Sequence, residues 1–228
     1  MSQIKQYFLA LALTSALIGS AAAAADVKIG FLAGFTGPLK SLAPGMYKGA
    51  KLAVKQINSQ GGILDGQKVI MPSGDSTCSD VTAAVDAAAL LVNDEKVLAI
   101  VGPLCSGAAI AVYKKVTIPA GITAVSPSAT SPAITSLDDG DLVFRTSPSD
   151  VYQGDIMARL LISKGIKHIV ITYVNNDWGK GISAELSKAF EAAGGEVAGN
   201  IAHEEGKTDY SDVIRSLSSP GVGTLVVL

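Results

Sequence analysis

The sequence predicts an α/β protein with two Rossmann-like, doubly wound parallel-sheet lobes, the second of them incomplete. Three observations carry this prediction. Apolar segments of strand length alternate with segments of helical periodicity, and the alternation runs through two series that meet near residues 147–148. Strands such as residues 97–101 (VLAIV) are continuously apolar, as in sheets covered on both faces. Apolar residues form 48% of the 228 positions, enough to bury the cores of two modest lobes.

The N-terminus has the pattern of an export signal. Lys5 precedes an apolar stretch at residues 7–19, and three alanines at 23–25 provide a small-residue cleavage site. The apolar stretch is shorter than the ~20 residues that a membrane-spanning helix needs. We therefore predict a signal peptide at residues 1–25, removed from a periplasmic protein.

The first series, residues 26–146, is predicted to form the first lobe. Its best-marked helix has apolar residues on one face and ends at the glycine pair 61–62. That face consists of Met46, Ala50, Ala53, Val54 and Ile57. Further helices are expected at residues 79–93 and 107–115, with a short helical turn after the loop that starts at Ser126. The predicted strands of this lobe are residues 27–33, 68–71, 97–101, 122–125 and 142–145.

The second series, residues 147–228, is predicted to form part of a second lobe. The helices expected here are residues 150–164, 179–193 and 210–218, and the strands are residues 166–174, 196–202 and 223–228. The last strand is read as buried, and the chain stops inside it. A sheet ending there would be half-built, so we expect this lobe to be partial.

Composition and motifs argue against several classes of function. The net charge of −2 argues against a basic surface for nucleic acid. The sequence also lacks a cluster of cysteines and histidines that would suggest a metal site. Gly30, Gly34 and Gly37 follow a strand but miss the dinucleotide spacing G-x-G-x-x-G, and no phosphate-binding loop is present. We therefore expect neither a cofactor nor catalysis.

The chain has two cysteines, Cys78 and Cys105. In an exported protein an isolated pair favours a disulfide, and each cysteine follows a predicted strand. Two independent buried thiols remain the alternative. A nucleophilic Cys105 with His168 or His203 as its base is a further hypothesis, which a disulfide would exclude.

Candidate ligand contacts lie where predicted strands end, because ligands of open α/β sheets bind beyond the carboxyl ends of the strands. The loops at residues 102–107 and 126–132 combine hydroxyl side chains with helix starts, an arrangement that suits a carboxylate. Ordinary helix capping is the alternative for each loop. Trp178, the single tryptophan, begins a helix of the second lobe and could cover an apolar ligand group. Tyr152 lies near the junction of the lobes, where it could face the ligand or pack its helix.

Several segments, in this order and spacing, resemble the periplasmic branched-chain amino-acid-binding proteins of ABC importers, the leucine/isoleucine/valine type. The matching segments are residues 29–38 (IGFLAGFTGP), 49–58 (GAKLAVKQIN) with 61–63 (GGI), 101–106 (VGPLCS), 126–132 (SPSATSP), 144–146 (FRT) and 177–181 (DWGKG). The resemblance covers nearly all of the chain after residue 25. It implies two hinged lobes of the type I periplasmic-binding-protein fold, a small amino-acid ligand, a membrane permease as partner, and a monomer.

The resemblance also assigns residues. It implies that Ser106, Ser128 and Thr130, with Ala129 between the last two, line the carboxylate and amino-group site. It places Trp178 at an aromatic contact from the second lobe. The pair formed by Cys78 and Cys105 falls where leucine-type members have a disulfide. One departure concerns selectivity, because those members carry a tryptophan where this chain has Leu42.

Other functions stay open at this point. The same two lobes would serve a sensory module that feeds a receptor, and the residues do not separate sensing from transport. An exported hydrolase would require a free Cys105. A non-functional truncated chain is the last alternative, since half a lobe exposes apolar surface.

Overall fold

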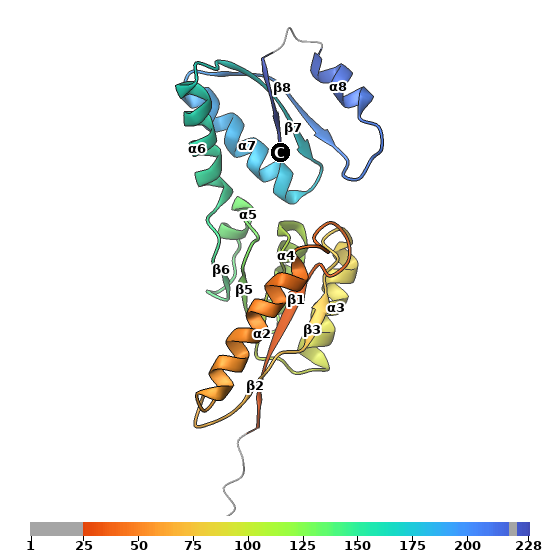
Figure 1. Cartoon of the computed structure of the whole chain (residues 1–228), viewed down its shortest axis with the longest axis vertical. Coiled ribbons are helices and arrows are strands. Elements are labelled where there is room, and N and C mark those ends of the chain that lie inside the picture. Colours follow the sequence, from red (N-terminus) through yellow and green to blue (C-terminus); the bar gives the residue numbers. More distant parts are fainter. Residues whose placement is uncertain (1–24, 219–222) are drawn as a thin grey trace, which may run out of the picture.

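The computed structural model describes residues 25–218 and 223–228 of the chain. These residues form two α/β lobes that follow one another along the long axis of the molecule (Figure 1). The predicted signal peptide, apart from residue 25, lies outside the described residues. Within the part of the chain that is described, no helix has the length and apolarity to cross a membrane.

The first lobe contains a six-stranded parallel sheet in which β1 lies inside. The strand order is β2-β1-β4-β5-β6, and β3 pairs with the later residues of β1. From β1 the chain first adds strands on one side and then returns to add β4, β5 and β6 on the other side, which is the doubly wound arrangement. The strands are β1 (Val27–Ala33), β2 (Val69–Ile70), β3 (Ser73–Asp75), β4 (Ala99–Val101), β5 (Thr123–Ser126) and β6 (Val143–Arg145).

Helices cover both faces of this sheet (Figure 1). Because successive strand residues point to opposite faces, Leu32 joins the core under α3 and α4, while Phe31 joins the core under α2. Both side chains are at most 1% exposed. The helical segments are α2 (Ala43–Ser59), α3 (Val81–Asn93), α4 (Ser106–Val112), its π-helical continuation η2 (Tyr113–Thr117) and the single turn α5 (Pro132–Thr135).

The edge of this sheet differs from the sequence prediction. The single strand expected at residues 68–71 is two short strands, with Met71 and Pro72 between them. Proline has no N–H for the ladder, but its carbonyl still accepts from the Phe31 N–H at 2.8 Å. The β3 residues, Ser-Gly-Asp, show no apolar alternation, so no local pattern indicated that the strand resumes.

The second lobe has a three-stranded parallel sheet in the order β8-β7-β9. Its core lies between β7 and the helices α6 and α7, and includes Ile169, Ile171, Leu186 and Phe190. Its elements are α6 (Asp150–Ser163), β7 (His168–Val174), α7 (Asp177–Ala192), β8 (Glu196–His203), α8 (Ser211–Ser218) and β9 (Thr224–Val227). The alternation of strands and helices predicted from the sequence is therefore confirmed in both lobes. The exact boundary between the lobes stays a prediction.

The helices α6 and α7 pack closely against each other. Gly154 of α6 lies against the α7 backbone, and a Cβ added to it would stand 2.8 Å from the carbonyl carbon of Glu185. Only a glycine fits at this distance without moving one of the helices. The chain therefore crosses from the first lobe into α6, which belongs structurally to the second lobe.

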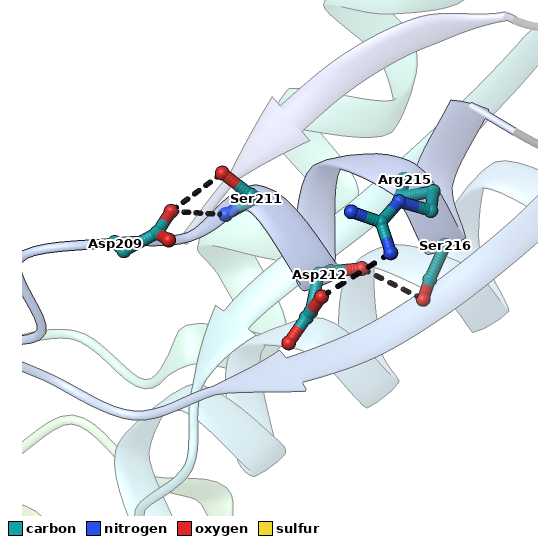
Figure 2. Close-up of polar contacts among 5 residues, drawn as sticks. All are labelled: Asp209, Ser211, Asp212, Arg215 and Ser216. Atoms are coloured by element: carbon teal, nitrogen blue, oxygen red, sulfur yellow. Dashed lines mark hydrogen bonds and ion pairs between the residues drawn. The ribbon is translucent and has the colours of Figure 1, made fainter.

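The last two elements of the second lobe lie at its surface. Figure 2 shows the start of α8, where Asp209 accepts a hydrogen bond of 2.8 Å from the Ser211 N–H, and where Arg215 pairs with Asp212 at 3.5 Å. The strand β9 was predicted to be buried, and this prediction is wrong. Its Leu225 and Val227 side chains are 50% and 65% exposed, because no other described element covers their face of the sheet.

Candidate functional site

The candidate site is built from loops that leave the carboxyl ends of parallel strands. In the first lobe, β4 leads into α4 and β5 leads into α5, so both loops meet at one edge of the sheet. In the second lobe, β7 leads into α7, and the start of that helix faces these loops (Figure 1). The fold therefore brings together the three segments that the sequence analysis singled out.

Hydrogen bonds join the two loops of the first lobe. The fully buried Ser126 hydroxyl donates to the Pro103 carbonyl at 2.6 Å and accepts from the Ala129 N–H at 2.9 Å. The Ser128 hydroxyl donates to the Leu104 carbonyl at 2.8 Å. The loop after β5 is thus held against the loop after β4, with the backbone around residues 128–130 in a defined position.

Ser106 and Thr130 lie in the same network. Ser106 is 2% exposed, starts α4, and its hydroxyl oxygen accepts from the Ser131 N–H at 3.2 Å. The Thr130 carbonyl accepts from Arg145 Nη1 at 3.1 Å and from the Asp150 N–H at 3.0 Å. The structure therefore places Ser106, Ser128, Ala129 and Thr130 in one hydrogen-bonded cluster. Their contact with a ligand stays a prediction.

Asp150 is a candidate residue that the sequence analysis missed. It is the first residue of α6 and is 1% exposed, and neither carboxylate oxygen makes a hydrogen bond of ordinary length and angle among the described residues, although the Thr130 hydroxyl is near enough to affect the carboxyl group. Burial raises the pKa of Asp150, while the Thr130 hydroxyl and the Arg145 guanidinium counteract part of the rise. In the sequence, an aspartate at the first helical position resembles any acidic residue near a helix N-terminus. Only the folded chain shows that it is buried behind Thr130.

The predicted disulfide is confirmed. Cys78 and Cys105 are bonded, with their Cα atoms 5.5 Å apart. Cys105 directly precedes Ser106, so the disulfide ties the start of α4 to the loop before α3. Because both cysteines are bonded, the hypothesis of a nucleophilic Cys105 is excluded for this form of the protein.

Asp75 fixes the loop that follows β1. Its carboxylate accepts hydrogen bonds from the backbone N–H groups of Phe35 at 2.9 Å and Thr77 at 2.9 Å, and from the Thr36 hydroxyl at 2.7 Å. Burial alone would raise the pKa of Asp75, but these hydrogen bonds outweigh it and hold the pKa below its ordinary value. This carboxylate therefore acts as a structural clamp at the same edge of the sheet.

From the second lobe, Trp178 belongs to α7, the helix that contacts α4 of the first lobe. Asn176 caps α7 by accepting from the Gly179 N–H at 2.8 Å, and Trp178 is half-buried in the first turn. Its neighbour Asp177 lies against Gly107 of α4. Tyr152, by contrast, is 67% exposed on α6, and no hydrogen bond within the described ranges joins its side chain to the loops.

Two cavities lie away from this cluster. One of 390 Å³ is at the β6 edge and includes Phe144 and Arg145, and one of 490 Å³ lies between β3 and α3. Neither is lined by Ser106, Ser128 or Thr130. Ser106 and Ala129 are buried, and Ser128 and Thr130 are partly buried, so these candidate contacts form a largely buried cluster of the first lobe.

Comparisons with known proteins agree on one family. A sequence model described as "Periplasmic binding protein" matches residues 26–228. The Leu/Ile/Val-binding protein BraC3 of Rhizobium johnstonii is 33% identical over 92% of this chain and 57% of its own length. The leucine-, isoleucine-, valine-, threonine- and alanine-binding protein of Pseudomonas aeruginosa is 32% identical over 96% of this chain and 58% of its own length. The chain thus spans little more than half the length of these curated relatives.

Solved structures give the same result. The substrate-binding protein LivJ of a branched-chain amino acid transporter from Streptococcus pneumoniae, in complex with isoleucine, has a TM-score of 0.76 and 31% identity, over 89% of this chain and 56% of that one. A solute-binding protein of an ABC transporter from R. palustris, in complex with benzoate, has a TM-score of 0.78 and 25% identity, over 89% and 55%. The two-lobed fold, the matching residues and these likenesses show that the chain belongs to the periplasmic binding protein family.

Proposed function

We propose that this chain is the ligand-capturing part of an exported solute-binding protein that delivers a small amino acid to an ABC importer. The named relatives bind leucine, isoleucine and valine or belong to branched-chain amino acid transport, and they support this class of ligand. Export by a cleaved signal peptide, a permease as partner and a monomeric state belong to the same proposal. The single observation that carries the ligand chemistry is the buried, unpartnered carboxylate of Asp150 beside the hydroxyl cluster.

The hydroxyl cluster suits the ligand carboxylate. Ser106 and Thr130 would offer hydroxyl donors, whereas the Ser128 hydroxyl already donates to the Leu104 carbonyl, so Ser128 would contribute through its backbone or by exchanging that bond. The network already fixes these positions, so little ordering is needed when the ligand docks. Trp178 would then cover the ligand side chain as the second lobe closes. Closure requires that the ligand bind the closed arrangement more tightly than the open one.

Asp150 suits the ligand ammonium group. A buried carboxylate without a hydrogen-bond partner is costly unless a positive charge comes near it. The Arg145 guanidinium supplies part of that charge, and an α-ammonium group docked at Thr130 would add to it, whereas a simple carboxylic acid would not. The negative charge at Asp150 therefore favours an amino acid over an aromatic acid such as benzoate, which the R. palustris protein binds.

The experiment compares three ligands by calorimetry and thermal shift on the protein expressed from its natural reading frame. Leucine at a hundred times its dissociation constant should stabilise the protein by roughly 2.7 kcal/mol. At the same concentration, benzoate and 4-methylpentanoate, the analogue of leucine without the amino group, should stabilise the protein much less. Ser106→Ala should weaken every carboxylate, while Asp150→Asn should weaken leucine and spare 4-methylpentanoate. Ser136→Ala, at an exposed serine whose hydroxyl bonds only the local Ala133 carbonyl, is the matched control.

Two results would redirect the proposal. Tighter binding of benzoate than of any amino acid would make this an aromatic-acid-binding protein. If Asp150→Asn weakened leucine and 4-methylpentanoate equally, Asp150 would have a structural role only, and the assignment of the ammonium group to this carboxylate would fail.

A further inference from the structure

The two lobes touch each other where two glycines lie in helices. Gly107 is in α4 of the first lobe, and an added Cβ would stand 3.0 Å from the Oδ2 atom of Asp177. Gly181 is in α7 of the second lobe, and its Cβ would stand 3.1 Å from Pro132 Cδ and 3.3 Å from the Ser131 hydroxyl. Each glycine thus faces a residue of the opposite lobe.

Backbone conformation does not require either glycine. Neither has a positive φ, and both lie within helices, where glycine costs roughly 1 kcal/mol relative to alanine. What distinguishes these positions is the space next to them. Gly49 of α2, also within a helix, has no atom within 4 Å of the position that its Cβ would take.

The contact also lies next to the candidate ligand residues. Gly107 follows Ser106, and Ser131 follows Thr130, while Asp177 precedes Trp178. Because Gly154 locks α6 against α7, a displacement of α7 would carry the packed helices of the second lobe with it. The separation of α4 and α5 from α7 therefore sets the distance of Trp178 from the hydroxyl cluster.

We propose that Gly107 and Gly181 are positioning residues that set how closely the two lobes approach, and thereby how far Trp178 reaches over the ligand. This proposal deepens the proposed function and rests on it where ligand affinity is concerned. The lobe contact itself is independent of any ligand. A side chain added at Gly181 meets the Pro132 ring and so pushes α7 away from the first lobe, whereas a methyl group at Gly107 meets the end of the Asp177 side chain and has a smaller effect, because that carboxylate can turn aside.

Trp178 supplies the readout, because it is the single tryptophan of the chain and is half-buried beside the contact. The variants are Gly107→Ala, Gly181→Ala and Gly181→Leu, with Gly49→Ala as the matched control. Without ligand, the two Gly181 variants should shift Trp178 emission to longer wavelength and increase the radius of gyration in X-ray scattering, and Gly107→Ala should do so to a smaller extent. The shift should be larger for leucine than for alanine at position 181, and Gly49→Ala should leave both quantities unchanged.

Ligand affinity is the second measurement. If a variant reduces the closed population to a tenth, the apparent dissociation constant should rise about tenfold, with the unfolding transition preserved. Emission and radius identical to those of Gly49→Ala in all three variants would overturn the proposal. A clear emission shift in a protein that binds none of the tested ligands would support the lobe contact and contradict only the proposed function. Circular dichroism identifies a variant that fails to fold, and the remaining glycine then decides.

Discussion

Loss of the Cys78–Cys105 disulfide should lower the free energy of unfolding by about 3.5 kcal/mol. The two cysteines are 27 residues apart, and the chain-entropy relation gives this value for a loop of that length. For a protein of this size the loss corresponds to a fall in melting temperature of roughly 7 to 14 °C. The perturbation is the double variant Cys78→Ser/Cys105→Ser, which removes the bond without leaving one free thiol.

Differential scanning calorimetry of the oxidised wild type, the reduced wild type and the double variant provides the assay. The reduced wild type and the double variant should melt together, below the oxidised protein, and reductant should not affect the variant. Equal melting temperatures in all three samples would refute the reasoning, because the loop would then be constrained as strongly without the bond. Since Cys105 precedes Ser106, weaker ligand binding should accompany the loss of stability.

Three further substitutions test the loops and the helix packing. Asp75→Asn should destabilise the protein fully at pH 7 and progressively less as pH falls below 3.8, because a carboxyl whose pKa is lowered by folding stabilises above its ordinary pKa and loses that contribution as pH falls through the lower, folded value. Urea denaturation at pH 7 and at a series of pH values below 3.8 measures this, and a loss that does not shrink along the series would contradict it. Gly154→Ala should lower the free energy of unfolding by about 1–3 kcal/mol because its Cβ meets the α7 backbone, whereas Gly49→Ala should leave it unchanged or raise it. If both variants raised the melting temperature, α6 and α7 would be able to move apart at little cost. Ser126→Ala should lower the free energy of unfolding by about 1–3 kcal/mol, because it leaves the buried Ala129 N–H and the Pro103 carbonyl unpaired. Hydrogen exchange at the Ala129 amide should then be faster. Unchanged exchange at that amide would show that other bonds hold the loop.

The bonds that fix the loops are unevenly distributed between the two lobes. The loops that carry the candidate hydroxyls are fixed by a disulfide and by Ser126, and the neighbouring loop after β1 is fixed by Asp75, all within the first lobe. Between the lobes, the Asp150 N–H donates to the Thr130 carbonyl at 3.0 Å, and α7 approaches α4 and α5 closely at Gly107 and Gly181. The bonds that hold these loops thus lie within the first lobe.

The sequence was sufficient for most of the fold. Helical periodicity, glycine pairs after helices and continuous apolar strands are local signals, so the order of elements in both lobes could be read without coordinates. Its predictions failed where the deciding contacts are not local. The strand β3 consists of Ser, Gly and Asp and exists because the neighbouring β1 pairs with it, and β9 is exposed although its composition is that of a buried strand.

The candidate site shows the same division. Hydroxyl residues at strand ends, the cysteine pair and the lone Trp178 were recognisable as residue types at suggestive positions. The burial of Asp150 behind Thr130, the exposure of Tyr152 and the meeting of Gly107 with Asp177 were not, because each depends on residues distant in the chain or on opposite lobes. The sequence by itself determined which elements form and in what order, since propensity and periodicity act over neighbouring residues. Only the tertiary structure decided which charges are buried and how closely the lobes approach, since desolvation and steric contact depend on atoms that folding alone brings together.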